Sequence, residues 1–318
     1  MRRRRVFLVG CPALLSAVAV MLGFVLATGA SSAHTGARTV STGSALLVSE
    51  TRSASQPQGL IAFKRSDGIY LMQPNGSHVR PLKKGRGSPV GHALDLAWSP
   101  DGHRLAFAAE DTIWVIDADG RNLVSFVLAG ATAAGSPTWS PDGRKIAYTA
   151  YRDGDRDIWV MNADGSEQRR LKRTPKLWDS NVDWKPTGGW LAFDSGGYAP
   201  YVYVMRTDGS GLHKVAPQRV SGNGDEQPDW SPDGRRIVYV NYDHEIWVMN
   251  ANGQSPTGLT SPVGEAHPVW SPDGSKIAFS CRGLTCNATG IYVMDADGTS
   301  ERRLTAGANP AWQPVSAR

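Results

Sequence analysis

The five residues Trp-Ser-Pro-Asp-Gly occur four times in this chain, at Trp98–Gly102, Trp139–Gly143, Trp230–Gly234 and Trp270–Gly274. Two degenerate copies begin at Trp184 and Trp312. The six tryptophans follow one another at intervals of 40 to 46 residues. A repeat of this length is typical of one four-stranded blade of a β-propeller. The sequence therefore predicts an all-β fold of six blades.

Each repeat continues in the same way after this turn. A short apolar run such as Leu105–Phe107 follows, and then a second run such as Ile113–Ile116. β-Branched and aromatic residues dominate both runs, as expected of strands buried on both faces between neighbouring blades. A turn such as Asp117–Gly120 and a more polar outer strand such as Glu301–Leu304 complete the repeat.

The two ends of the repeat region each contain part of a blade. Residues 60–82 contain the second, third and fourth strands of a blade without a first strand, whereas residues 309–314 contain a first strand with nothing after it. We therefore predict a six-bladed propeller over residues 59–315, closed by the C-terminal strand completing the N-terminal blade. Such closure removes the free edges of a linear stack.

The ordered motifs W-S-P-D-G, I-A-[FY] and I-[YW]-V-M-[ND]-A-D-G resemble the six-bladed propeller of the TolB family and its WD-repeat-like relatives. The resemblance covers about residues 59–315 and implies a TolB-like β-propeller. TolB proper has a globular domain before its propeller. In that place this chain has only residues 34–58, whose Ser, Thr, Gly, Ala and Gln content predicts a flexible linker. The resemblance thus implies an architecture, without the role that depends on the missing domain.

The N-terminus has the composition of an export signal. Four arginines, Arg2–Arg5, precede the apolar run Val6–Ala30, and the small residues Ser31–Ala33 follow. This order predicts that residues 1–33 are a secretory signal peptide. The run of 25 residues is also long enough to cross a bilayer, so an uncleaved membrane anchor is the alternative. Both interpretations place the propeller outside the cytoplasm, as a periplasmic, secreted or outward-facing anchored domain.

The charge of the chain gives no reason to expect a nucleic-acid partner. The formal net charge is +5, but residues 1–33 contribute four arginines and no acidic residue. The remainder has 30 Lys and Arg against 29 Asp and Glu. A nearly neutral body lacks the positive field that attracts nucleic acid or anionic membranes. We predict a protein or peptide partner, possible contact with membrane only through an uncleaved N-terminus, and a monomer.

Two cysteines lie in the propeller region, Cys281 and Cys286. In an oxidising compartment they are candidates for a disulfide that closes a small loop. A metal site would need further ligands, and no histidine lies in that stretch. We expect no metal and no cofactor.

The sequence has no recognisable catalytic motif. It lacks the Gly-x-Ser-x-Gly elbow, the phosphate loop, His-Glu-x-x-His and the dinucleotide fingerprint. The repeated Pro-Asp-Gly and Asp-Ala-Asp-Gly segments suit turns better than active sites or calcium loops. We therefore predict a binding protein and no catalytic residues.

The candidate site is a ring of polar residues three positions before each repeat tryptophan. In a propeller this segment enters the innermost strand, which lines the central channel. Alternation along the strand predicts that the ring shares a face with the residues two positions later, and Asp183, Asp229 and Glu226 should make one arc acidic. The predicted channel-mouth residues are Asp95, Ser136, Asn181, Asp183, Glu226, Gln227, Asp229, His267 and Asn309.

Two interpretations of this ring remain open: solvated loop residues around a water-filled channel, or a site for a cationic peptide segment, a cation or a small polar ligand. We favour an extracytoplasmic scaffold that holds a protein or peptide partner at the channel mouth and inter-blade loops. The alternative is a propeller enzyme, a lyase or hydrolase acting on carbohydrate or peptide in the channel. A third possibility is the sensor part of an envelope complex.

Overall fold

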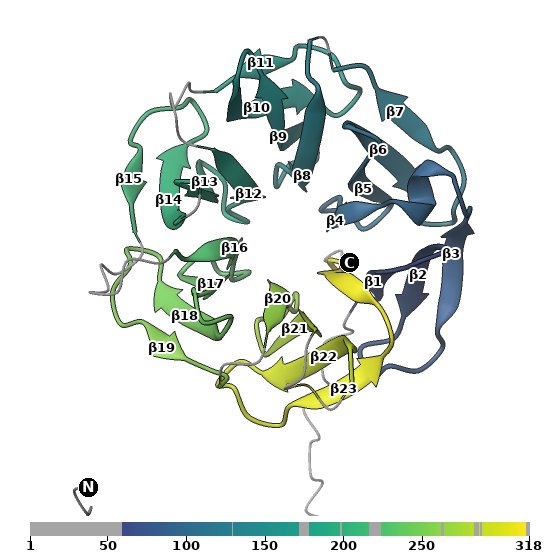
Figure 1. The fold of residues 1–318 in the computed structure, drawn as a ribbon, viewed down its shortest axis with the longest axis vertical. Helices are drawn as coiled ribbons and strands as arrows, with labels where there is room; N and C mark the ends of the chain where they lie inside the picture. The colour runs from purple at the N-terminus through teal and green to yellow at the C-terminus, as the bar shows by residue number, and fades with distance from the viewer. Residues whose placement is uncertain are drawn as a thin grey trace, which may run out of the picture. The chain divides into compact units, whose positions relative to one another are not determined.

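The computed structural model describes residues 59–315 except for 129, 172–177, 198, 216–223, 262–263, 283–285 and 287. These residues belong to one compact unit, Arg52–Arg318. They form six antiparallel sheets of four strands around one axis, which confirms the predicted six-bladed propeller (Figure 1). The predicted signal or anchor and the predicted linker lie outside the described residues.

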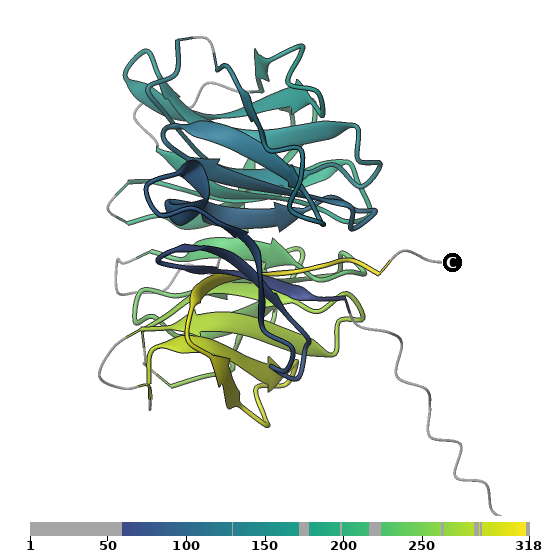
Figure 2. The same ribbon diagram turned by 90° about the vertical axis from the view of Figure 1, so that its right-hand side faces the viewer.

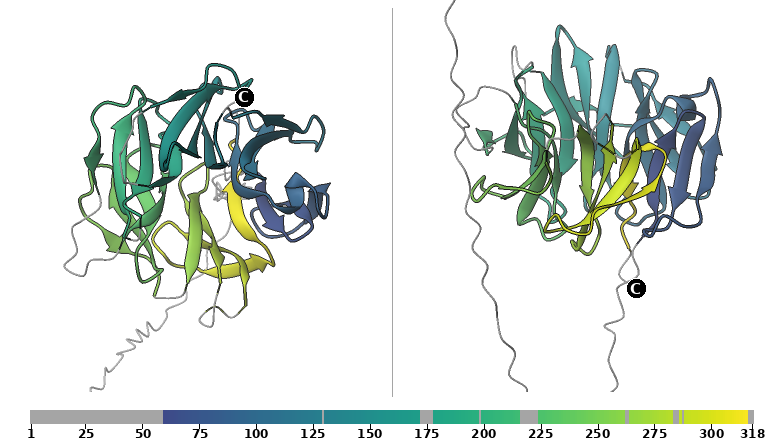
Figure 3. Two further views of the ribbon diagram at one scale, coloured as in Figure 1. Left: turned by 45° about the horizontal axis from the view of Figure 1, so that its top comes forward. Right: turned by 60° about the horizontal axis from the view of Figure 1, so that its bottom comes forward.

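Each blade begins beside the central axis and ends at the rim. The innermost strands are β24 (Ala308–Trp312), β4 (Leu94–Trp98), β8 (Ala133–Trp139), β12 (Asp179–Trp184), β16 (Glu226–Trp230) and β20 (Glu265–Trp270). The second strands are β1 (Ile61–Arg65), β5 (Arg104–Ala109), β9 (Lys145–Arg152), β13 (Trp190–Ser195), β17 (Arg236–Val240) and β21 (Lys276–Cys281). The edge-on and oblique views show these strands running between the two faces of the ring (Figure 2, Figure 3).

The third strands carry the second apolar run of each repeat. They are β2 (Gly68–Met72), β6 (Thr112–Asp117), β10 (Asp155–Asn162), β14 (Tyr201–Arg206), β18 (Ile246–Asn250) and β22 (Gly290–Asp295). The short outer strands are β3 (Arg80–Lys84), β7 (Val124–Phe126), β11 (Arg169–Arg170), β15 (His213–Lys214), β19 (Thr257–Gly258) and β23 (Arg302–Thr305). Within the part of the chain that the structure describes, the 3₁₀ turn η1 (Pro89–Gly91) is the sole helical element.

The ring closes as predicted. The first blade has the strand order β24-β1-β2-β3, so the C-terminal strand pairs with the N-terminal one. The pairing is antiparallel, with Trp312 opposite Ile61 and Ala308 opposite Lys64. Beyond the strand, the backbone N–H of Gln313 donates a hydrogen bond to the carbonyl of Leu60.

The hydrophobic core consists of six clusters, and each cluster lies between two neighbouring blades. The second strand of every blade contributes one large aromatic residue that is at most 1% exposed: Phe63, Phe107, Tyr148, Phe193, Tyr239 and Phe279. Because both faces of a blade are buried, the alternating polar pattern of a one-sided sheet is absent from these strands. This packing makes each blade depend on its neighbours.

The Trp-Ser-Pro-Asp-Gly segments are turns, as the sequence predicts. In the third blade the Asp142 carboxylate accepts hydrogen bonds from the Ser140 hydroxyl (2.6 Å) and the Arg144 backbone N–H (3.1 Å). Gly143 has a φ of +68°, which a residue without Cβ adopts readily. The tryptophan links neighbouring blades: the indole N–H of Trp139 donates to the carbonyl of Ala97, 3.2 Å away.

Candidate functional site

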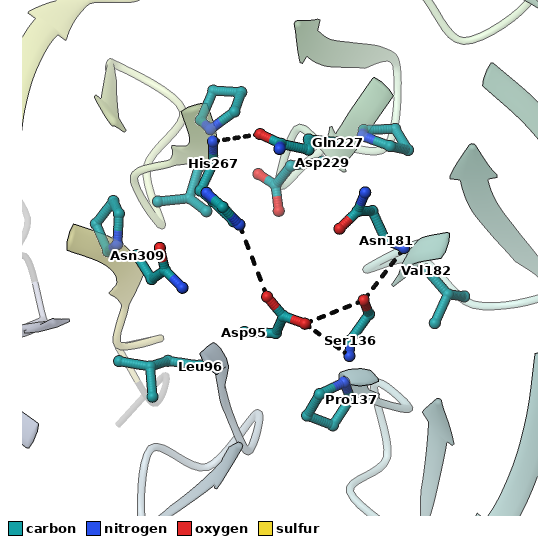
Figure 4. Close-up of a pocket in the computed structure, with 14 residues that line it drawn as sticks. Asp95, Leu96, Ser136, Pro137, Asn181, Val182, Gln227, Asp229, His267 and Asn309 are labelled. Atoms are coloured by element: carbon teal, nitrogen blue, oxygen red, sulfur yellow. Dashed lines mark hydrogen bonds and ion pairs between the residues drawn. The ribbon is translucent and has the colours of Figure 1, made fainter. Parts of the chain in front are cut away.

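The six polar residues of the predicted ring come together around one cavity at the channel mouth (Figure 4). The cavity has a volume of about 100 Å³. Each blade contributes one ring residue from its innermost strand: Asp95, Ser136, Asn181, Gln227, His267 and Asn309. We call these six residues the mouth ring.

A β-bulge directs each mouth-ring side chain. All six residues have a positive φ between 47° and 56°, although none is glycine. In the second blade the pairing changes from Leu94 opposite Ala108 to Ala97 opposite Ala106, so the inner strand contains one extra residue. An extra residue in the left-handed conformation turns its side chain out of the strand's alternation. The same shift occurs in the inner strands of the third to sixth blades.

The bulge corrects one prediction from the sequence. Strict alternation placed the ring on the same face as the residues two positions later. Of those residues only Asp229 and Val269 line the cavity. The remaining wall is formed by the residue directly after each ring position: Leu96, Pro137, Val182, Pro228, Pro268 and Pro310.

Several mouth-ring side chains join one blade to the next. The Asp95 carboxylate accepts a hydrogen bond from the Ser136 backbone N–H (2.9 Å), and the Ser136 hydroxyl accepts one from the Asn181 N–H (3.2 Å). The Gln227 side-chain oxygen accepts one from the His267 N–H (2.6 Å). These side chains therefore also stabilise the ring of blades, whatever they bind.

One ion pair crosses the mouth. The His267 Nε2 atom lies 3.7 Å from the Asp95 Oδ1 atom, and the two residues come from blades separated by the first blade (Figure 4). Burial opposes ionisation of Asp95, but hydrogen bonding to His267, its charge and donors from Ser136 together lower the pKa of Asp95. These partners therefore favour the ionised form of Asp95.

Two buried polar atoms of the mouth ring have no hydrogen-bond partner among the described residues. They are His267 Nδ1 and Asn309 Oδ1, and Asn309 is only 3% exposed. A buried polar group without a partner is destabilising by about 1–3 kcal/mol. Both residues line the cavity, so the mouth ring has hydrogen-bonding capacity that no described residue uses.

Of the three carboxylates predicted to make one arc of the mouth acidic, only Asp229 lines the cavity. Its carboxylate accepts a hydrogen bond from the Trp270 N–H (2.9 Å). Asp183 lies in the neighbouring blade and accepts one from the Trp230 N–H (2.8 Å). Glu226 is not among the cavity-lining residues; it pairs with Val240 in the strand before the bulge.

Burial changes the ionisation of this arc. It raises the pKa of Asp183 to about 6, although hydrogen bonds from Trp230, Thr138 and Trp184 act in the opposite direction. Burial and the nearby charge of Asp183 raise the pKa of Asp229 well above its ordinary value. Two neighbouring carboxyls of this kind bind a proton more favourably than an exposed pair would.

A further buried carboxyl, Asp194, was missed from the sequence. It lies on the second strand β13 and accepts hydrogen bonds from the Asn181 side chain (2.7 Å) and the Gln227 backbone (3.2 Å). Burial raises its pKa to about 6, and the charge of Glu226 acts in the same direction. The available signal was that Asp194 is the only acidic residue at this position of the repeats, which Lys64, Ala108, Thr149, Val240 and Ser280 occupy elsewhere.

Three exposed apolar or aromatic side chains lie on the same face of the ring as the mouth. Leu94 begins an inner strand and is 46% exposed, Trp178 directly precedes another and is 51% exposed, and Tyr242 in the β17–β18 turn is 57% exposed. Large aromatic side chains that combine apolar area with a polar tip are enriched at protein–protein interfaces.

Cys281 and Cys286 are joined by a disulfide, with their Cα atoms 6.2 Å apart. The disulfide closes the start of the connection between β21 and β22. Among the described residues, no three His, Cys, Asp or Glu side chains are grouped so as to hold a metal ion. In the same residues no helix has the length and apolar character needed to span a membrane.

A family model described as the TolB beta propeller domain matches residues 97–316, which is more than half of the chain. The chain belongs to the TolB β-propeller family. An uncharacterized protein of Agrobacterium fabrum is 30% identical over 204 residues. The match covers 60% of this chain and 65% of that protein, so the chain spans slightly less than two thirds of this relative's length.

Solved structures of the same fold have diverged far in sequence. TolB from Acinetobacter baumannii superposes with a TM-score of 0.68 at 20% identity, over 81% of this chain and 67% of that chain. An oligogalacturonate lyase in complex with manganese superposes with a TM-score of 0.56 at 19% identity, over 76% of this chain and 70% of that chain. At these identities the likeness shows the propeller fold alone.

Proposed function

We propose that this TolB-family propeller is an extracytoplasmic scaffold that binds a protein or peptide partner at the channel mouth and the surrounding loops. The observation that carries the proposal is the mouth ring, which a repeated bulge turns into one cavity on a face that also exposes Leu94, Trp178 and Tyr242. A polar centre with exposed apolar and aromatic residues on the same face suits a protein interface better than an isolated small-molecule site.

The size of the cavity favours a single inserted side chain. At about 100 Å³ it is smaller than the roughly 300–1,000 Å³ of ordinary small-molecule pockets. Asp95 and Asp229 line it, with Asp183 close by, so the chemistry favours a lysine or arginine side chain. A cationic segment of the partner would then be anchored at the mouth while its flanks contact the exposed aromatics.

The placement outside the cytoplasm rests on the N-terminal sequence. The arginine cluster and apolar run of residues 1–33 support export, by a cleaved signal or an uncleaved anchor. Membership of the TolB family agrees with this placement. Fractionation of cells that produce the full-length protein tests it: recovery of the propeller in the cytoplasm would refute the proposal.

The test of the binding proposal uses fluorescein-labelled hexalysine as the probe and purified full-length protein. We expect binding that weakens at least tenfold in the variant Asp183→Asn/Asp229→Asn. The matched control is Asp119→Asn/Asp164→Asn, which makes the same two substitutions in exposed turns on the other face of the ring. Equal losses in both variants, or no binding by the wild type, would overturn the proposal.

The observation in favour of the enzyme alternative is a fold likeness to solved enzymes, such as an oligogalacturonate lyase. A cavity of about 100 Å³ at the mouth cannot enclose an oligosaccharide unless the His267–Asp95 pair opens. Turnover of a carbohydrate or peptide that is lost in His267→Ala, with the fold intact, would make the enzyme the better hypothesis.

A further inference from the structure

A second, larger cavity opens on the same face, at the seam where the first and sixth blades meet. Its volume is about 900 Å³. Residues 306–308 line it and lead directly into Asn309 of the mouth ring, so the two cavities are neighbours. Its lining also includes Lys64, Arg65, Ser66, Asp67, Tyr70, Arg86, Arg282 and Thr289. We call this cavity the basic groove.

The groove has four cationic side chains and one carboxylate, Asp67, which already has partners. The Tyr70 hydroxyl donates to the Asp67 carboxylate at 2.9 Å, and Lys84 Nζ lies 3.6 Å from it. Asp67 therefore does not neutralise the groove. The propeller region as a whole is nearly neutral, so this local excess of positive charge is not a reflection of bulk composition.

Two cations of the groove, Lys64 and Arg282, are close enough for the charge of one to act on the other. Burial and the neighbouring charge of Arg282 lower the pKa of Lys64, and the charge of Asp95 acts in the opposite direction. In the described part of the chain, the Arg86 and Arg282 side chains have no ion pair or hydrogen bond, and both residues are exposed. Like charges held together in this way are destabilising, and a bound anion would relieve the repulsion.

Arg65 is fixed in position within the groove. Its Nε donates to the Ala306 carbonyl at 3.1 Å, its Nη2 donates to the Thr305 hydroxyl at 2.9 Å, and its guanidinium lies 4.6 Å from the centre of the Tyr70 ring. Arg282 lies within the loop that the Cys281–Cys286 disulfide closes. Prepositioned guanidinium groups bind carboxylates with little further loss of side-chain entropy.

We propose that the basic groove binds an acidic stretch of the partner protein, several residues long. The groove is about nine times larger than the mouth cavity, and its cations come from β1, from the segment after β3 and from the β21–β22 connection. A single small anion would fill only part of this cavity and would leave some of the four cations without a counter-ion. The inference rests on the proposed function, because the groove would orient the same partner whose cationic side chain enters the mouth.

The experiment measures binding of fluorescein-labelled hexaglutamate to the full-length protein by anisotropy at low salt. We expect Arg86→Gln/Arg282→Gln to weaken binding at least tenfold, because both side chains line the groove and neither supports the fold. The matched control is Arg144→Gln/Arg235→Gln, which removes the same charge from exposed turns on the opposite face; it should change the affinity less than twofold.

The inference would be overturned by no binding of hexaglutamate, by equal losses in both arginine variants, or by displacement by inorganic phosphate at the same concentration as by unlabelled hexaglutamate. The last would indicate a site for a single small anion. Tighter binding of a heparin tetrasaccharide, lost in the same groove variant, would indicate a glycan site and would also contradict it.

The two proposals fail separately. If the mouth proposal alone is wrong, hexalysine binding fails while hexaglutamate binding keeps its dependence on Arg86 and Arg282. If the groove proposal alone is wrong, hexalysine binding still depends on Asp183 and Asp229 while the arginine variants have no specific effect.

Discussion

At the scale of single residues, Asp183 ties the stability of the propeller to pH. Burial raises the pKa of this carboxyl from 3.8 to about 6. The folded state therefore binds a proton that the unfolded chain has lost, and this proton contributes stability fully below about pH 4. The contribution disappears as the pH rises through about 6, because the ionised carboxylate is then confined in the channel wall.

Asp183→Asn should remove this pH dependence and stabilise the protein above pH 7. The amide oxygen can still accept from the Trp230 N–H, so the inter-blade hydrogen bond is kept. We expect a gain in the free energy of unfolding on the order of 1–2 kcal/mol at pH 8, and much less at pH 4. Urea unfolding at the two pH values measures this gain. If the free energy of unfolding changes with pH equally in the variant and the wild type, Asp183 is not the group responsible.

The left-handed conformation of the mouth ring is testable at Gln227, whose φ is +56°. A β-branched residue is strained there by roughly 1–2 kcal/mol, whereas glycine adopts this conformation freely. Gln227→Val and Gln227→Gly both lose the hydrogen bond to His267, so their difference isolates the backbone. We expect the valine variant to be less stable than the glycine variant by about 1 kcal/mol in urea unfolding. Equal stabilities would show that the bulge relaxes.

At the scale of secondary-structure elements, the repeated turn stabilises each blade locally. The Asp142 carboxylate holds the Ser140 hydroxyl and the Arg144 N–H. Asp142→Ala should lower the free energy of unfolding by about 1–2 kcal/mol, because both donors lose their acceptor. Asp142→Asn keeps an oxygen in place and should lose less than half as much. A similar loss in both variants would mean that charge, and not turn geometry, matters at this position.

The inner strands show where prediction from sequence ended. Repeat spacing and apolar runs located the three inner strands of the blades, because buried strands leave a strong local pattern, whereas the short polar outer strands were placed only in some blades. The mouth ring was also located, since six polar residues stand at one register. The bulge that directs these side chains into the cavity was not predicted, because a non-glycine residue at positive φ has no dependable signature in a single sequence. Glu226 was misplaced for that reason, and the basic groove was missed because Lys64 and Arg282 are far apart in the chain.

At the scale of the whole molecule, closure determines whether the blades hold together. The strand β24 contributes Trp312 to the cluster between the sixth and first blades, and Ala311 to the cluster between the first and second. Loss of this strand would expose the edge of β1 and open two inter-blade clusters at once. Each blade is stable chiefly through its neighbours, so the damage should not stay local.

A chain that ends after Gly307 should therefore lose cooperative unfolding, or fail to fold, while a chain that ends after Val315 should behave like the full-length protein. Because complete misfolding would obscure the cause, Trp312→Ala provides the graded version. Its indole is 7% exposed, and its removal should cost about 3–5 kcal/mol. Thermal unfolding followed by near-UV circular dichroism, which reports on the buried tryptophans, measures the cooperativity of the truncated chains and the stability of Trp312→Ala. A cooperative transition of normal enthalpy in the Gly307 chain would show that the remaining strands close the ring without β24.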